Sequence, residues 1–96
     1  MEDNKCVVLN LTGCKYVGEL HQRIKVAFDF PDYYGENWDA LWDCLRYLFA
    51  DGTPITVDIH GFLKLHEELR SYCVTMLELF DDLHRESPNV KFKVVS

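Results

Sequence analysis

The chain has 96 residues, of which 48% are hydrophobic and 14% aromatic, and its formal net charge at pH 7 is −6. This length leaves room for one domain with one core, and the apolar content excludes a disordered tail. The acidic balance argues against nucleic-acid binding, because Lys and Arg must replace the counterions of the phosphates.

The first residues do not show the charged segment and apolar run of a secretory signal. No apolar stretch approaches the roughly 20 residues that cross a bilayer. We therefore expect a soluble, cytoplasmic protein that binds no membrane. In a reducing compartment Cys6, Cys14, Cys44 and Cys73 are expected to be free thiols with structural roles. A disulfide or a metal is the less favoured interpretation, because their spacing matches no zinc finger or ribbon. We expect no cofactor.

The first half of the chain predicts a strand followed by two helices. Residues 5–11 are largely apolar and partly β-branched, which is typical of a strand. Apolar residues at helical spacing predict a helix over about 16–28. Residues 31–37 form a polar loop, and Asn37 is a natural N-cap for a second helix over about 37–49.

The second half predicts two more strands with a helical segment between them. Residues 55–60 alternate apolar and polar side chains, and a last strand is predicted over 90–95. Residues 62–86 suggest a short helix, a kink near 66–70 and a long helix. Strands joined by helical crossovers usually lie parallel. The sequence therefore predicts one α/β domain over 1–96, with a three-stranded parallel sheet packed by about four helices.

The negative charge is concentrated in two segments. Residues 29–51 carry −5 and residues 78–86 carry −3, whereas the rest of the chain is net positive. Asp39 and Asp43 are four residues apart and lie on the same side of the second predicted helix. Like charges one turn apart repel, so this pair favours a face that meets a positively charged partner. For the acids of 78–86 alone, a plain solvated face is the simpler interpretation.

Aromatic residues accompany these acids. Tyr33 and Tyr34 lie in the polar loop, where a buried ring would need a partner for its hydroxyl group. Trp38 and Trp42 follow in the helix, at positions whose spacing favours the core. Aromatic rings beside fixed charges are typical of interface hot spots, so the loop and helix predict a protein-binding face.

Residues 31–45, with the sequence PDYYGENWDALWDCL, closely resemble the signature segment of the barstar family of intracellular ribonuclease inhibitors. Asp32 and Trp38 are the two differences from the family pattern in this stretch. The segment Leu20-His21-Gln22 and the order of the predicted elements extend the resemblance over nearly the whole chain. The resemblance implies the family fold of a three-stranded parallel sheet with helices.

The resemblance also implies roles for individual residues. Asp43 matches the central acid that enters the catalytic cleft of a nuclease in place of a phosphate, and Asp39 matches a second acid that pairs with basic groups. Tyr33 matches the tyrosine that lies against the catalytic imidazole. The full set of expected partner contacts is Tyr33, Tyr34, Gly35, Asn37, Trp38, Asp39, Trp42, Asp43, Arg46, Asp82 and Glu86.

The expected function is therefore inhibition of a small, basic, secreted ribonuclease of the barnase type, as a monomer in a 1:1 complex. Arg46 departs from the family pattern and lies on the side of Asp39 and Asp43, where it would repel a basic cleft. The alternatives are that it pairs with one of these acids or meets an acid of a different target. The alternative is an interaction or immunity module whose target is not a ribonuclease. An enzyme is disfavoured because the sequence carries no Gly-rich phosphate loop and no nucleophile motif.

Overall fold

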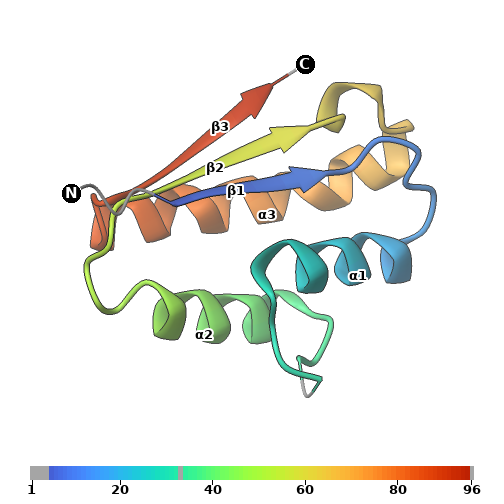
Figure 1. Ribbon diagram of the computed structural model, residues 1–96. Coiled ribbons are helices and arrows are strands. Elements are labelled where there is room, and N and C mark those ends of the chain that lie inside the picture. The colour runs from blue at the N-terminus through green and yellow to red at the C-terminus, as the bar shows by residue number, and fades with distance from the viewer. Residues whose placement is uncertain (1–4, 33, 96) are drawn as a thin grey trace.

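The computed structural model describes residues 5–32 and 34–95, and its strands and helices are shown in Figure 1. The elements in chain order are β1 (Lys5–Asn10), α1 (Val17–Phe28), α2 (Trp38–Leu48), β2 (Ile55–His60), the 3₁₀ turn η1 (Phe62–Lys64), α3 (Glu67–Glu86) and β3 (Val90–Val95). The three strands and the three main helices predicted from the sequence are confirmed, with ends close to the expected positions.

The segment 62–86 holds one α-helix rather than two. Its first part, η1, is a single 3₁₀ turn, and α3 starts at Glu67 with His66 as its N-cap. Within the described residues the prediction of about four helices is therefore corrected to three α-helices and one 3₁₀ turn. Gly61 makes the preceding turn with a φ of 84°, and a Cβ there would lie 2.6 Å from the backbone nitrogen of Thr12. Only glycine fits this position.

The three strands form one parallel sheet in which β2 lies between β1 and β3. Ile55, Val57 and Ile59 of β2 are buried, and all three α-helices cover this side of the sheet (Figure 1). The opposite face of the sheet has no helix on it within the described residues. Lys91 and Lys93 of β3 alternate with the core residues of that strand and therefore project from the uncovered face.

The end of α1 directs the chain toward the polar loop. Asp29 adopts a left-handed conformation with a φ of 56°, and its N–H donates to the Val26 carbonyl at 3.2 Å. The Phe30 N–H donates to the Lys25 carbonyl at 2.9 Å, which completes a Schellman motif. The Phe28 and Phe30 rings stack with centroids 5.4 Å apart, and both are buried. The hydrogen bonds and the stacked rings therefore hold the start of the loop 31–37 against the core.

The four cysteines are free thiols in the structure, as predicted. Cys14 and Cys73 are buried, and burial raises the pKa of the Cys73 thiol to about 12. Over residues 5–32 and 34–95, no helix has the length and apolarity that a membrane crossing needs.

Candidate protein-binding face

The start of α2 is fixed by the polar loop that precedes it. The Asn37 side chain accepts the Ala40 N–H at 2.8 Å and donates to the Gly35 carbonyl at 3.2 Å. Glu36, between them, has a φ of 55°, and its carboxylate accepts a hydrogen bond from Gln22 of α1 at 2.6 Å. A non-glycine residue in this region costs about 1–2 kcal/mol, so the surrounding contacts hold the loop in a set conformation.

A buried histidine ties this loop to two helices. His21 of α1 is fully buried, and its Nδ1 and Nε2 atoms each lie 2.9 Å from a tyrosine hydroxyl, those of Tyr34 and Tyr72. Burial lowers the pKa of His21, against a smaller opposite effect of the Glu36 charge. A neutral imidazole has one N–H and one acceptor nitrogen, so His21 donates to one tyrosine and accepts from the other. The loop, α1 and α3 are thereby joined in the core.

The structure corrects one expected contact. Tyr34 is 6% exposed, so its side chain lies in the core rather than on a partner-binding surface. The sequence argument against burial assumed that the hydroxyl group would lack a partner, whereas His21 supplies one. Tyr33 lies outside the described residues. Gly35 and Asn37 are exposed on the loop, as the prediction requires.

Asp39 and Asp43 are exposed on α2, and neither has an ion-pair partner in the part of the chain that the structure describes. Trp38 and Trp42 flank them, are half-buried and pack against the core. The Trp38 ring lies 4.9 Å from His21 and 4.8 Å from Tyr72 between centroids. The tryptophans therefore anchor the helix while their side chains stay partly exposed.

A groove between α2 and α3 continues the acidic face. It has a volume of about 300 Å³, and its lining residues are Trp38, Asp39, Trp42, Thr75, Glu78, Leu79 and Asp82. Three of these residues are acids and two are tryptophans. Carboxylates beside aromatic rings suit a cationic side chain, which forms ion pairs and cation–π contacts there. We name this hollow the α2–α3 groove.

Arg46 pairs with an acid of the other helix and not with the α2 acids. Its Nε lies 3.3 Å from the Glu86 carboxylate, and its guanidinium lies 5.8 Å from the centre of the Trp42 ring. Both side chains are about half exposed, so the ion pair contributes less than about 1 kcal/mol. Asp82 is also paired, with Arg85 at 3.2 Å. The predicted face thus holds internal ion pairs beside the unpaired Asp39 and Asp43.

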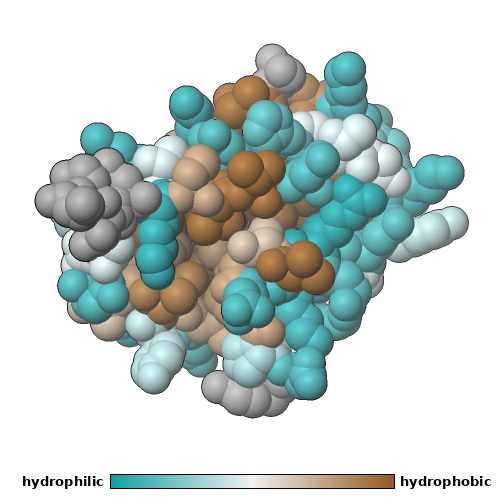
Figure 2. All heavy atoms as spheres, in the orientation of Figure 1, coloured by the Kyte–Doolittle hydropathy of each residue, from teal (hydrophilic) through white to brown (hydrophobic). Residues whose placement is uncertain are grey.

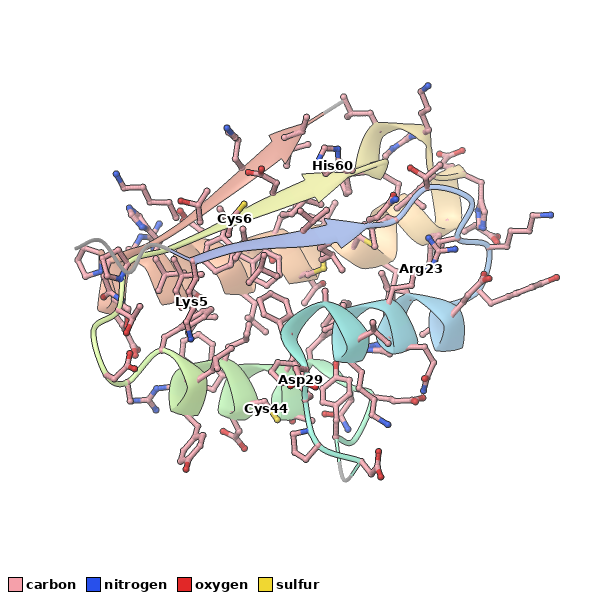
Figure 3. All side chains as sticks on the ribbon, viewed as in Figure 1. Lys5, Cys6, Arg23, Asp29, Cys44 and His60 are labelled. Carbon is pink, nitrogen blue, oxygen red and sulfur yellow. The ribbon has the colours of Figure 1, made fainter. Side chains whose placement is uncertain are left out.

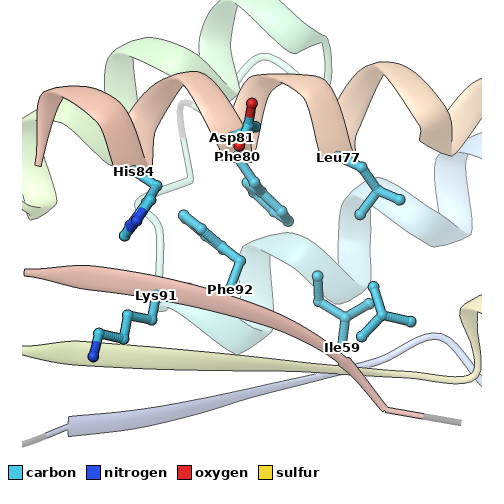
Figure 4. Close-up of a pocket in the computed structure, with 8 residues that line it drawn as sticks. Ile59, Leu77, Phe80, Asp81, His84, Lys91 and Phe92 are labelled. Carbon is cyan, nitrogen blue, oxygen red and sulfur yellow. The ribbon is translucent and has the colours of Figure 1, made fainter. Parts of the chain in front are cut away.

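Another hollow lies along the other side of α3, facing β3 (Figure 4). It has a volume of about 470 Å³ and is lined mainly by apolar residues such as Leu77 and Phe92. At its edge, the Nδ1–H of His84 donates a hydrogen bond to the Val90 carbonyl at 2.6 Å. No group of three or more His, Cys, Asp or Glu residues suited to a metal ion occurs among residues 5–32 and 34–95. The exposed acids and the tryptophans gather along α2 instead, so the candidate site is the α2 face.

Sequence reasoning missed the supporting residues of this face. The sequence held one indication of the role of His21, which lies next to Leu20 and Ile24 on the apolar side of α1. A histidine buried on such a side needs hydrogen-bond partners. Nothing in the sequence indicated the role of Tyr72, since its partner His21 is 51 residues away. Glu36 and Gln22 are likewise joined by the tertiary fold alone.

The fold and this surface define a small α/β protein with an exposed, acidic, aromatic helix. The family described as "Barstar (barnase inhibitor)" matches residues 4–96. A Bacillus subtilis (strain 168) protein named "Putative ribonuclease inhibitor YrdF" is 40% identical over 76 residues, which are 79% of this chain and 80% of that protein. The chain belongs to the Barstar family, as the resemblance of residues 31–45 predicted.

Proposed function

We propose that this protein inhibits a small, basic, secreted ribonuclease of the barnase type by filling its active-site cleft with α2 and the loop 31–37. The observation that carries the proposal is the pair of exposed carboxylates of Asp39 and Asp43, which have no ion-pair partner among the described residues, on a helix held by Asn37 and His21. Such a cleft must bind RNA phosphates with Lys, Arg and His. Carboxylates replace the phosphates there and offer no ester bond to cleave.

Each group of the face has a role in this proposal. Asp43 takes the central phosphate position, and Asp39 with the α2–α3 groove receives a basic side chain from the rim of the cleft. Tyr33, Gly35 and Asn37 form the loop side of the contact. Trp38 and Trp42 support the groove, Arg46 and Glu86 lie at its edge, and Tyr34 acts from the core by fixing the loop.

The available surface fits a 1:1 complex of a monomer. The described chain has an accessible surface of 5951 Å². A standard interface buries about 800 Å² on each partner, which is roughly a seventh of that surface. In this proposal the inhibitor acts in the cytoplasm, where it protects the producing cell from its own nuclease before secretion.

Inhibition itself is tested by the rate of RNA cleavage by purified barnase with and without this protein. We expect cleavage to stop at equimolar inhibitor. Because the charges on the two proteins are opposite, association is expected to slow about tenfold or more between 20 mM and 300 mM NaCl, since the Debye length falls to below about 10 Å above 0.1 M. Stopped-flow fluorescence measures this rate. An association rate that is independent of salt would rule out electrostatic steering.

Arg46 gives a more specific prediction. Replacing Arg46 by Thr removes the cation that neutralises Glu86, so the face gains one unit of negative charge. Association with barnase is expected to become about two- to fivefold faster at low salt. Glu86→Gln is the matched variant, because it breaks the same ion pair with the opposite change in net charge, and it should slow association. A loss of affinity in Arg46→Thr would show that Arg46 binds the partner.

Arg46 is also the observation that favours a second candidate function. A cation within an acidic face suits a partner that carries an acid at that point, and a non-ribonuclease target of an immunity module meets this requirement as well. If barnase remains active with an excess of this protein, purification of bound proteins from the native cell distinguishes the two functions. A retained basic nuclease supports inhibition of another ribonuclease, and any other retained partner supports the alternative.

A further inference from the structure

A second hollow borders the acid pair on the side away from the α2–α3 groove. It lies between α2 and the segment 28–31, has a volume of about 470 Å³ and includes Asp43 in its lining. We propose that this hollow, the 28–31 pocket, receives an arginine side chain of the nuclease. This inference rests on the proposed function and extends it to a contact that sets which nuclease is bound.

The walls of the pocket are apolar and fixed. Phe28 and Phe30 are buried and stacked, and Pro31 follows them at the end of the Schellman motif. Leu48 at the end of α2, which is 36% exposed, forms the facing wall. In Figure 2, hydrophobic atoms gather over the region between β1, α2 and the end of α1. A side chain that enters this pocket therefore needs an apolar stem.

The charges around the pocket are all negative. Asp29 and Asp43 line it, and no Lys, Arg or His of the described residues does so. Figure 3 shows Asp29 close to Cys44, another lining residue, below the end of α1. The left-handed turn at Asp29 fixes the backbone that carries this carboxylate. The pocket therefore suits a side chain with a positive end.

Tyr47 adds an aromatic ring to the same pocket. It is 88% exposed and lies one helical turn after Asp43, on the same side of α2. A large aromatic side chain this exposed gains nothing from the core of its own chain. A guanidinium group stacks on a tyrosine ring and pairs with carboxylates, and its methylene stem packs on apolar walls. Lysine shares the apolar stem and the positive end, but the planar guanidinium group of arginine also stacks flat on the ring and pairs with a carboxylate through two N–H groups, so arginine fits best.

The 28–31 pocket and the α2–α3 groove lie on opposite sides of the acid pair and would contact different parts of the nuclease. The acid pair Asp39 and Asp43 forms a ridge with the α2–α3 groove on one side and the 28–31 pocket on the other. A basic nuclease therefore meets the ridge with its cleft and both hollows with its rim. The residues of the 28–31 pocket other than Asp43 act as specificity determinants, because they contact the rim of the cleft rather than its catalytic groups.

The test measures the affinity of variants for barnase. Leu48→Arg places a positive charge in the pocket and is expected to weaken binding at least about tenfold, since like charges at an interface are strongly unfavourable. Val26→Arg is the matched control, because Val26 is an apolar, 77% exposed residue of α1 outside the predicted face, and it should change affinity less than about threefold. Asp29→Asn keeps a residue that tolerates the left-handed conformation and should weaken binding about threefold.

Double-mutant cycles identify the partner side chain. Each arginine of barnase is changed to Ala and combined with Asp29→Asn and with Tyr47→Ala. One arginine should show coupling with both changes and none with Asp39→Ala. If Asp43→Ala weakens binding while Leu48→Arg and Asp29→Asn do not, the pocket proposal is wrong and the proposed function stands.

A second probe separates the two proposals when barnase is not bound. N-acetyl-argininamide is titrated into the protein and followed by backbone NMR, with N-acetyl-leucinamide as the control. Shifts at Asp29, Tyr47 and Leu48 with the arginine compound alone support the pocket even if ribonuclease inhibition fails. Equal shifts with both compounds, or none at these residues, overturn it.

Discussion

Replacing Asp43 by Asn is expected to weaken inhibition of a barnase-type ribonuclease by at least about 2 kcal/mol, which is roughly 30-fold in affinity. Asp43 is exposed and has no ion-pair partner within the described residues, so its charge is available to a partner without any internal contact being broken. In a complex the basic groups around it would be left buried and unpaired, which is the larger part of the cost. Inhibition constants from RNA cleavage measure the effect.

The matched control for this change is Asp58→Asn. Asp58 lies on the uncovered face of β2, and Asn there removes the same charge at a site away from α2. Its effect on the inhibition constant should stay below about threefold, because a distant charge is screened at physiological salt. Equal losses in the two variants would mean that net charge matters and the position of Asp43 does not.

Replacing His21 by Ala is expected to destabilise the fold by about 3 kcal/mol. The change leaves a cavity at a fully buried position, and it removes the partner of both the Tyr34 and the Tyr72 hydroxyl groups. Urea unfolding measures the free energy. His21→Gln keeps a donor and an acceptor and should lose less than half as much, so a similar loss in both variants would contradict a role for the hydrogen bonds.

The same histidine makes stability depend on pH. Burial lowers the pKa of His21 in the folded state, so protonation favours the unfolded chain. The stability that the neutral ring provides is complete above the unfolded pKa of about 6.5 and is lost as the pH falls below it. The unfolding free energy should therefore drop more steeply from pH 7 to pH 5 in the native protein than in His21→Gln. Parallel curves for the two proteins would exclude His21 as the titrating group.

The predicted elements were correct where local sequence decides the structure. The alternation of 55–60 fixed the buried face of β2, and Asn37 capped α2 because its side chain reaches an N–H only three residues away. The spacing of Asp39 and Asp43 placed both acids on the exposed side of that helix. The short helix expected after residue 62 is the single 3₁₀ turn η1, which ends because Leu65 is extended, with a ψ of 147°.

The parts of the site that sequence reasoning could not supply depend on partners far along the chain. Tyr34 was expected at the surface because its hydroxyl partner, His21, lies 13 residues away on α1 and the sequence does not show that the two meet. For Arg46 the sequence left a pairing with Asp39 or Asp43 open beside other roles, and the structure pairs it with Glu86 of α3. Helical spacing predicts which residues of one helix share a side, but it does not predict which residues of two different helices meet.

The uncovered face of the sheet has a consequence for the encounter with the proposed nuclease. Lys91 and Lys93 project from that face, where Lys93 lies 3.9 Å from the Asp58 carboxylate, while Asp39 and Asp43 lie on α2 on the far side of the core. The positive charge on the uncovered face and the carboxylates on α2 therefore give the molecule an electric dipole. In the field of a positively charged cleft this dipole experiences a torque that turns α2 foremost, so a collision that begins in the wrong orientation is corrected before the surfaces touch.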